Sequence, residues 1–227
     1  MSPPNQSIVI AVDGTAASGK GTLAKKLAVH FGFAHLDSGA LYRLAAYSVM
    51  QSNGDPRNEA DAIRGAQTMD FNLAGDPRIR TDFVGQAASF VAAIPAVRAA
   101  LFDFQRNFLE HPPGGSPGAV MDGRDIGTVI CPSATAKLYV DARPEVRARR
   151  RWAELKGMGI RRSEGDLLKE LNDRDAADKS RPVSPLIQAP DAALLDTSDL
   201  GIDAAFAAAL ALVSPKIERA LKDRPRG

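Results

Sequence analysis

Residues 12–28 have the sequence VDGTAASGKGTLAKKLA, and this stretch decides the class of fold. Gly14, four further residues, Gly19 and Lys20 follow the spacing of a phosphate-binding loop, in which backbone N–H groups and a lysine surround phosphate oxygens. The common form of this loop continues with Ser or Thr, whose hydroxyl binds magnesium; here Gly21 stands there and Thr22 follows it. The candidate polyphosphate-binding residues are Gly14, Thr15, Ala16, Ala17, Ser18, Gly19, Lys20, Gly21 and Thr22.

The residues around this loop have the pattern of a strand before it and a helix after it. The run SIVIAV (7–12) is continuously apolar and β-branched, as in a buried parallel strand. Leu23, Leu27 and Phe31 repeat at helical spacing. We expect further strands, separated by helical patterns, at 34–37, 118–122, 136–141 and 193–197. This alternation predicts an α/β fold of three layers, a P-loop fold whose parallel sheet is flanked by helices.

Two other segments yield structural predictions. Apolar residues at helical spacing run from Phe90 to Phe108, and Pro95 interrupts them, so we expect two consecutive helices. Residues 68–84 alternate weakly around the tripeptide GDP, which favours a small β-hairpin.

The composition places the chain among ordinary globular proteins. Its 227 residues include 29 basic and 27 acidic ones, a net charge of +2 that gives no overall attraction to nucleic acid or membrane. A single cysteine, Cys131, allows no internal disulfide. The start MSPPNQS lacks the basic and apolar regions of a signal peptide, and no apolar stretch is long enough to cross a bilayer. We therefore expect a soluble cytoplasmic protein that does not bind membranes.

Polar residues follow the second predicted strand in LDSGALYR (36–43). Ligands of open parallel sheets bind beyond the carboxyl ends of the strands, so this motif lies at the expected edge. Ser38 is well placed to cap the helix that follows, which is the purely structural interpretation. Arg43 is better explained by bidentate binding of a phosphate.

A second polar motif, MDGRDIGTVI (121–130), follows another predicted strand. Asp122, Arg124 and Asp125 could form a charged turn that is satisfied by its own salt bridge. We favour ligand binding, because three charges gather at the ligand edge of the sheet. An acidic residue at a strand end beside a phosphate loop also commonly helps to position magnesium.

Basic residues gather toward the C-terminal half of the chain. Residues 143–162 hold eight of them and two acidic ones, and Arg147, Arg150 and Arg151 share one helical face. A solvated surface or a nucleic-acid patch is possible, although few aromatic residues are interleaved for stacking. Residues 172–181 mix basic and acidic side chains, which argues against nucleic acid. We favour a lid that closes over polyphosphate.

Five motifs together resemble the bacterial cytidylate kinase family, in the family's order and across nearly the whole chain: GTAASGKGT (14–22), LDSGALYR (36–43), AASFVAAIPAVR (87–98), DGRDIGTV (122–129) and RDAADKSRPVSPL (174–186). In this family the phosphate loop ordinarily contains G-K-G-T, so Gly21 and Thr22 match it. The resemblance implies one domain over 1–227. Its core would be 6–40, 101–150 and 186–221, its acceptor-binding region about 41–100, and its lid about 151–185.

The resemblance also implies the roles of individual residues. Gly14 to Thr22 would bind ATP, and Lys20, Arg124 and Arg181 would be catalytic. CMP or dCMP would be the acceptor, with its phosphate bound by Arg43, Arg124 and Arg181 and by Ser38. The base would be recognised by Ser89, Arg98 and Asp125, and the sugar by Arg174 and Asp178. Asp122 completes the candidate substrate site. The sequence departs from the family in a shorter β-rich insert at 68–84, in the absence of a glycine midway in TAAS, and in the uncharged Ala176 and Ala177.

The implied reaction transfers the γ-phosphoryl group of ATP to the phosphate of CMP. Magnesium is expected on the nucleotide phosphates, with no metal site made of protein ligands. We expect a monomer whose partners are small molecules, with no nucleic acid. Two alternatives remain: a related kinase that acts on UMP or shikimate, and a nucleic-acid-binding P-loop ATPase. No acidic pair follows 118–122 and no N-K-x-D is present, which disfavours a helicase and a GTPase.

Overall fold

The computed structural model describes residues 7–224 of the chain. Two sequence predictions, the lack of a signal peptide and the start of the core at residue 6, concern the first six residues and lie outside this range. The chain forms two compact units. The first comprises Met1–Leu36 and Leu109–Gly227, and the second comprises Asp37–Phe108. The predicted acceptor-binding region, about 41–100, falls within the second unit.

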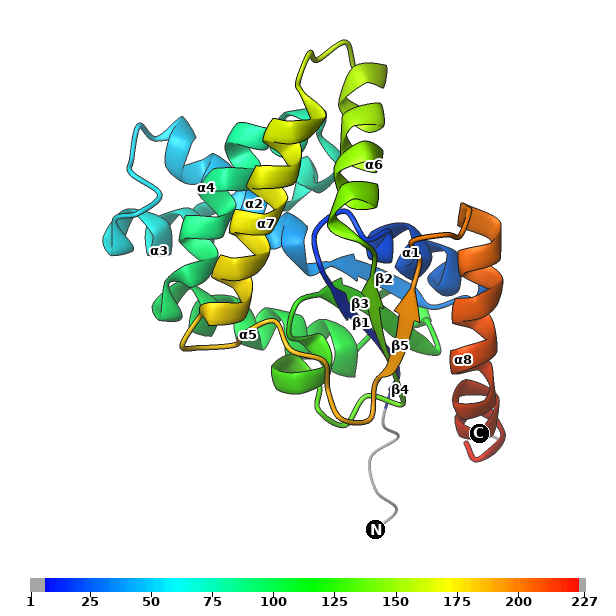
Figure 1. The fold of residues 1–227 in the computed structure, drawn as a ribbon. Helices are drawn as coiled ribbons and strands as arrows, with labels where there is room; N and C mark the ends of the chain where they lie inside the picture. Colours follow the sequence, from blue (N-terminus) through cyan, green and yellow to red (C-terminus); the bar gives the residue numbers. More distant parts are fainter. Residues whose placement is uncertain (1–6, 225–227) are drawn as a thin grey trace. The chain divides into compact units, whose positions relative to one another are not determined.

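A parallel sheet of five strands organises the first unit (Figure 1). The order in the sheet is β2-β3-β1-β4-β5, and β1 pairs in parallel with both β3 and β4. The strands are β1 (Ile8–Gly14), β2 (Ala34–Asp37), β3 (Gly118–Gly123), β4 (Ala136–Asp141) and β5 (Ala193–Asp196). They occur where the sequence predicts them, and the α/β class with a parallel sheet flanked by helices is confirmed.

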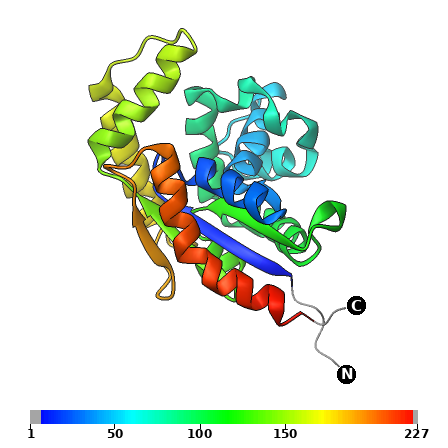
Figure 2. The same cartoon turned by 90° about the vertical axis from the view of Figure 1, so that its right-hand side faces the viewer.

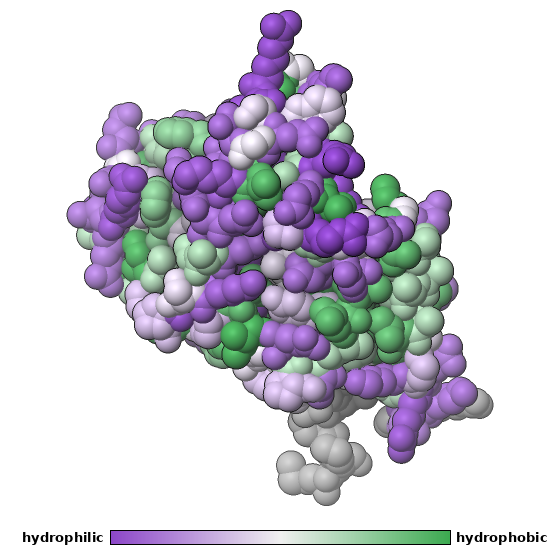
Figure 3. All heavy atoms as spheres, in the orientation of Figure 1, coloured by the Kyte–Doolittle hydropathy of each residue, from purple (hydrophilic) through white to green (hydrophobic). Residues whose placement is uncertain are grey.

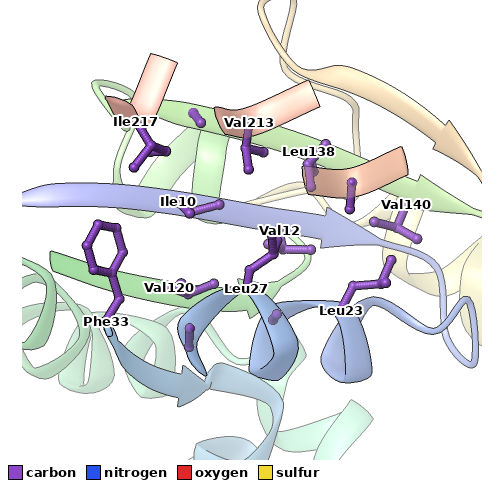
Figure 4. Close-up of a cluster of buried hydrophobic side chains, with 14 of the residues drawn as sticks. Ile10, Val12, Leu23, Leu27, Phe33, Val120, Leu138, Val140, Val213 and Ile217 are labelled. Carbon is purple, nitrogen blue, oxygen red and sulfur yellow. The ribbon is translucent and has the colours of Figure 1, made fainter. Parts of the chain in front are cut away.

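Alternation along β1 explains how helices cover the sheet. Ile8, Ile10 and Val12 belong to a buried cluster to which α1 (Lys20–Phe31) and α8 (Ile202–Lys222) contribute (Figure 4). Helix α8 runs alongside β1 in Figure 2. The intervening residues Val9 and Ala11 are buried as well, so both faces of this strand are covered. The carboxyl ends of the strands are thereby held on a rigid support.

Helices α6 (Pro144–Gly157) and α7 (Glu164–Ser180) pack against each other as a hairpin of the first unit (Figure 1). Leu155, Leu167 and Leu171 form a small buried cluster between them. At the tip of this hairpin, hydrophilic side chains lie beside the exposed hydrophobic residues Met158 and Ile160 (Figure 3). The predicted lid, about 151–185, lies in this part of the chain, and its closure stays a prediction. The same unit contains the short turns η3 (Pro113–Gly115) and η4 (Ile126–Ile130).

The second unit is helical. Its elements are α2 (Ser38–Gln51), α3 (Glu59–Thr68), η1 (Phe71–Gly75), η2 (Pro77–Arg80), α4 (Asp82–Ala93) and α5 (Pro95–Glu110), the last of which ends in the first unit. Helix α2 packs against α3 and α4. The predicted break into two helices at Pro95 is confirmed.

The predicted hairpin at 68–84 is wrong. The side chains of Asp70 and Asp76 accept hydrogen bonds from the backbone N–H groups of Asn72 and Arg78 at 2.9 and 2.8 Å, and each aspartate is the N-cap of a short 3-10 helix. Such local side-chain caps compete with strand pairing. Pro77, at the first position of η2, also suits a helical turn rather than a sheet.

Across residues 7–224, no single helix is long and apolar enough to cross a membrane. Helix α4 together with Pro95–Gly115 meets that criterion only as a pair bent by 95°.

Candidate active site

The phosphate loop joins β1 to α1 and depends on glycine at two positions. A Cβ at Gly14 would lie 1.9 Å from the carbonyl oxygen of Val140 in β4, so no side chain fits there. Gly19 has a φ of 92°, in the left-handed region, and is the N-cap of α1. Lys20 begins the helix, and its Nζ donates to the carbonyl oxygen of Thr15 at 3.3 Å. The lysine ammonium therefore lies over the loop at the positive end of a helix.

Side chains from other elements hold the loop in place. The hydroxyl of Thr15 donates to Oδ1 of Asp141, at the end of β4, at 2.6 Å. The carbonyl oxygen of Ser18 accepts from the hydroxyl of Thr197 at 2.9 Å. Ala17 has a φ of 58°. It lies in the segment TAAS, where the family often has a glycine, and an alanine is strained in this left-handed conformation. The loop is thus fixed by contacts well outside its own sequence.

Two of the clustered arginines support this loop. NH1 of Arg147 donates to the carbonyl oxygen of Ala16 at 3.2 Å, and NH1 of Arg150 to that of Ser18 at 3.4 Å. Arg150 also binds Thr197 through both its hydroxyl and its carbonyl oxygen. Arg151 pairs with Glu154 at 2.8 Å. The shared face predicted from the spacing is therefore occupied largely by contacts within the protein, which weakens the hypothesis of a nucleic-acid patch.

Asp122 of β3 lies beside the start of α1. Asp122 is 4% exposed, and its Oδ1 is 2.9 Å from Nε2 of His35 in β2. A Cβ at Gly21 would lie 3.4 Å from its other oxygen. The role of His35 as a partner was missed in the sequence, where the only signal was a polar residue inside a short predicted strand.

Arg124, Arg174 and Arg181 surround Asp178 of α7. Nε of Arg124 donates to Oδ2 of Asp178 at 2.8 Å, and NH2 of Arg181 lies 3.7 Å from Oδ1. Burial alone would raise the pKa of the Asp178 carboxyl, but the positive charges of the three arginines hold it below its usual value. Arg124 is likewise buried, and its neighbouring carboxylates raise its pKa above the ordinary value despite that burial.

This cluster decides between the two interpretations of MDGRDIGTVI. Arg124 forms its ion pair with a carboxylate 54 residues away, rather than serving only its own turn. The guanidinium groups of Arg124, Arg174 and Arg181 all act on Asp178 near the carboxyl end of β3, and such groups are suited to the binding of an anion. Asp125, which is 5% exposed, directly precedes η4 and completes the motif.

Asp13 is a further residue that the sequence analysis missed. Its carboxylate accepts hydrogen bonds from the backbone N–H groups of Ile126 and Gly127, at 2.8 and 2.7 Å. It is 4% exposed, and burial raises its pKa to about 6 even though both hydrogen bonds act to lower it. Asp13 therefore fixes the backbone that follows Arg124 and Asp125. The signal available was an acidic residue at the end of an otherwise apolar strand.

The second unit contains four candidate residues, and at Ser38 a sequence expectation is corrected. Asp37, not Ser38, caps α2: its side chain accepts from the backbone N–H of Ala40 at 3.1 Å, while Ser38 is the first helical residue. The shift has a simple cause, because the extended backbone of Asp37 is the N-cap conformation. Ser38 is 4% exposed and is therefore buried at the start of the helix.

Arg43 and Ser89 meet at Gly85 of α4. NH1 of Arg43 donates to the carbonyl oxygens of Ile79 and Thr81, at 2.9 and 3.1 Å, and a Cβ at Gly85 would lie 2.9 Å from NH2. The hydroxyl of Ser89 donates to the carbonyl oxygen of Gly85 at 3.2 Å. Gly85 thus makes room for the Arg43 guanidinium.

Arg98 of α5 is 7% exposed. It donates to the carbonyl oxygen of Ala92 at 3.4 Å, and its guanidinium carbon lies 5.4 Å from the centre of the Tyr42 ring. A buried guanidinium close to an aromatic ring is suited to the recognition of a planar group.

The first unit therefore has the features of a P-loop phosphotransferase. A glycine-rich loop has its lysine at a helix N-terminus, the neighbouring strand β3 supplies a carboxylate, and a cluster of arginines lies near the end of β3.

Comparison with known proteins makes this class specific. The family model described as cytidylate kinase matches residues 10–214. A cytidylate kinase of Bradyrhizobium diazoefficiens is 52% identical over 206 residues, covering 91% of this chain and 95% of that protein. A cytidylate kinase of Rhodospirillum rubrum is 49% identical over 212 residues, covering 93% of this chain and all of that protein. The chain belongs to the cytidylate kinase family, and it is a phosphotransferase of the nucleoside monophosphate kinase type.

A solved structure of an uncharacterized protein from Eubacterium ventriosum has the same fold, with a TM-score of 0.52. It covers 92% of this chain and 99% of its own, at 13% identity. At that identity the likeness concerns the fold alone.

Proposed function

We propose that the protein transfers the γ-phosphoryl group of Mg·ATP to the 5′-phosphate of CMP and of dCMP, forming ADP and CDP or dCDP. Membership of the cytidylate kinase family supports the acceptor, and the arginine cluster around Asp178 is the observation that carries the chemistry. The positive charges of Arg124, Arg174 and Arg181 all act on the buried carboxylate of Asp178. Guanidinium groups gathered near the carboxyl end of a parallel strand are suited to a phosphate.

The donor would bind at the loop from Gly14 to Thr22. Backbone N–H groups and the N-terminus of α1 offer partial positive charge to the polyphosphate, and Lys20 adds a full charge. ATP as donor follows from the family, and the loop has the form that such a donor requires.

Magnesium fits this site as an ion carried by the nucleotide. Among residues 7–224, no group of three or more His, Cys, Asp or Glu side chains could hold a metal. Magnesium commonly uses one or two carboxylates together with phosphates and water, and buried Asp122 beside Gly21 would be such a carboxylate. Thr22 would bind a phosphate or a metal-bound water. The ion would supply charge neutralisation on the donor phosphates.

The acceptor roles in the second unit rest on the motifs of the family. Arg43 would bind the acceptor phosphate with help from Ser38. Ser89 and Arg98 would recognise the cytosine base, together with Asp125 of the first unit. Cytosine presents an exocyclic amino group, so an oxygen acceptor favours it over uracil, which would leave that acceptor unpaired. Arg174 and Asp178 would bind the sugar.

The acceptor oxygen is already anionic, so the reaction needs no general base. The obstacle is repulsion between two anionic phosphates that must approach in line. Lys20, Arg124 and Arg181 would offset this repulsion in the transition state. A lid formed by about 151–185 would exclude water, which competes as an acceptor. We also propose that the protein acts as a monomer in the cytoplasm, with no nucleic-acid partner.

The deciding experiment is an acceptor panel with ATP and coupled detection of ADP. CMP and dCMP should give kcat/KM values at least about 100-fold above those of UMP and AMP, given the penalty for unpaired polar groups. The same panel should include shikimate as a non-nucleotide acceptor, and RNA and DNA as stimulators. A preference for UMP or shikimate would show that the protein is a kinase with another acceptor. ATP hydrolysis stimulated by RNA or DNA would show instead that it is a nucleic-acid-dependent ATPase.

A further inference from the structure

Both halves of a buried ion pair hold one residue of the phosphate loop. The backbone N–H of Ala16 donates to Oδ1 of Asp175 at 3.4 Å, and its carbonyl oxygen accepts from NH1 of Arg147 at 3.2 Å. NH1 of Arg147 and Oδ2 of Asp175 are themselves 2.6 Å apart. The whole residues are 3% and 5% exposed. The backbone of Ala16 is therefore oriented by α6 and α7 at once.

The arginine half of the pair is anchored independently of Asp175. Nε of Arg147 donates to the carbonyl oxygen of Ala142 at 2.8 Å, just before α6 begins. Ala16 also packs into the apolar cluster of α6 and α7, against Ala148 and Leu171. Apolar packing brings loop and hairpin together without direction, whereas the ion pair fixes where the N–H and C=O of Ala16 point.

The aspartate half lies on the part of α7 that carries the candidate acceptor residues. Arg174 precedes Asp175 directly, and Asp178 follows it by three residues, which on a helix places the two carboxylates on neighbouring positions of one face. Asp178 is bound to Arg124 at the end of β3 at 2.8 Å. A single stretch of α7 thus contacts the phosphate loop through Asp175 and the arginine cluster through Asp178.

We infer that Asp175 and Arg147 are positioning residues that couple donor binding at the phosphate loop to acceptor binding at α7. This inference rests on the proposed function. An acceptor whose phosphate binds Arg181 and whose sugar binds Arg174 fixes α7, and fixing α7 fixes the carboxylate that orients Ala16. The loop then pays less ordering entropy when the donor binds. The coupling is reciprocal, so the donor must strengthen acceptor binding by the same factor.

The test must separate positioning from simple stability. Removing one partner leaves a buried unpaired charge and is strongly destabilising, whereas replacing both by apolar residues of similar size is often tolerated. The variant is therefore Arg147→Met with Asp175→Leu. A matched control is Lys169→Met with Asp173→Leu, which removes an exposed pair, 2.5 Å apart, from the same helix. Arg147→Lys keeps the charge but loses the planar fork, and it serves if the double variant does not fold.

Calorimetry would measure ADP binding to each protein with and without saturating CMP. In the wild type, CMP should tighten ADP binding by at least about fivefold. In the folded double variant this factor should fall below about twofold, with kcat about tenfold lower, and Arg147→Lys should be intermediate. The control should match the wild type.

Two results would overturn the inference alone. The first is a wild-type protein in which CMP does not change the affinity for ADP. The second is a folded double variant, or an Arg147→Lys protein, in which CMP tightens ADP binding as much as in the wild type and kcat is unchanged. A wild type that binds ADP but not CMP would instead overturn the proposed function, and with it this inference.

Discussion

Gly21 lies directly beside the carboxylate of Asp122: a Cβ built on Gly21 would be 3.4 Å from Oδ2 of Asp122. The other oxygen of that carboxylate is 2.9 Å from Nε2 of His35. A Ser or Thr at position 21, as in the common phosphate loop, would bring a hydroxyl against a carboxylate that already has a partner. Gly21 therefore leaves room for the Asp122 carboxylate, which we propose above as a ligand of the nucleotide-bound magnesium.

The first prediction tests this exchange. Gly21→Ala adds only an ordinary van der Waals contact and should keep the fold and most of the activity. Gly21→Ser adds a hydroxyl that competes for Asp122, and kcat/KM should fall about tenfold, or 1.4 kcal/mol of transition-state stabilisation. Steady-state kinetics at several magnesium concentrations measures both variants. Equal losses in the two variants would mean that the added Cβ, and not the hydroxyl, is responsible.

Gly85 provides the second prediction. In Gly85→Ala the new Cβ meets the mobile end of Arg43, 2.9 Å away, so the side chain can move while the helix gains about 1 kcal/mol of propensity. Thermal stability should change little or rise, while KM for CMP rises about tenfold because Arg43 is displaced. In the contrasting variant Gly65→Ala the Cβ would lie 2.6 Å from the backbone oxygen of Ala45. That protein should lose stability, with KM unchanged for the folded fraction. A stable Gly85→Ala protein with an unaltered KM for CMP would contradict the proposed role of Arg43 in binding the acceptor phosphate.

Features encoded locally could be predicted from the sequence. The strand at 7–12, the phosphate loop and the break at Pro95 each depend on residues within one or two turns, and all three are present. The predicted hairpin at 68–84 is wrong because local interactions in this segment favour helical turns over strands. The local caps of Asp70 and Asp76 outweigh the weak alternation of apolar residues that predicts the hairpin.

Contacts between distant residues could not be predicted in this way. Asp13 binds Ile126 across 113 positions, and Asp175 binds Ala16 across 159. No spacing rule relates such pairs, because the order of the strands in the sheet decides which loops become neighbours. For Arg147 and Arg150, a shared helical face was predicted, but a charge pattern cannot tell a ligand face from a face buried against a loop.

The third prediction concerns the charge of Lys20. Lys20→Met keeps the length of the side chain and removes the ammonium that donates to Thr15. Turnover should fall by at least about 100-fold, as when a preorganised electrostatic contact to the transition state is lost, while far-UV circular dichroism and the melting temperature stay near those of the wild type. Lys25→Met, on the exposed face of the same helix, should have normal turnover. A Lys20→Met enzyme with a near-normal rate would contradict the assignment of the phosphate loop.

The fourth prediction concerns Asp13, whose pKa burial raises from 3.8 to about 6 in the folded protein. The folded state then holds a proton that the unfolded state releases between these two values. Stability from this group is therefore fully present below about pH 4, falls as the pH rises, and is lost above about pH 6. Nearby Asp125 adds to the rise in pKa, and Arg124 and the two backbone N–H groups oppose it.

Asp13→Asn removes this titration and isolates it from that of every other carboxyl. The free energy of unfolding of the wild type minus that of Asp13→Asn should decrease between pH 4 and pH 7, by on the order of 3 kcal/mol for a shift of about two pKa units. Urea denaturation at half-unit steps of pH measures this difference. Asp203→Asn is the control, because Lys26 lowers the pKa of Asp203 and the difference should then increase with pH. A flat or rising difference for Asp13 would mean that its two hydrogen bonds, and not its burial, determine the pKa.

Asparagine also offers only one oxygen to the N–H groups of Ile126 and Gly127, so this variant should lose turnover at pH 7 through displacement of Arg124.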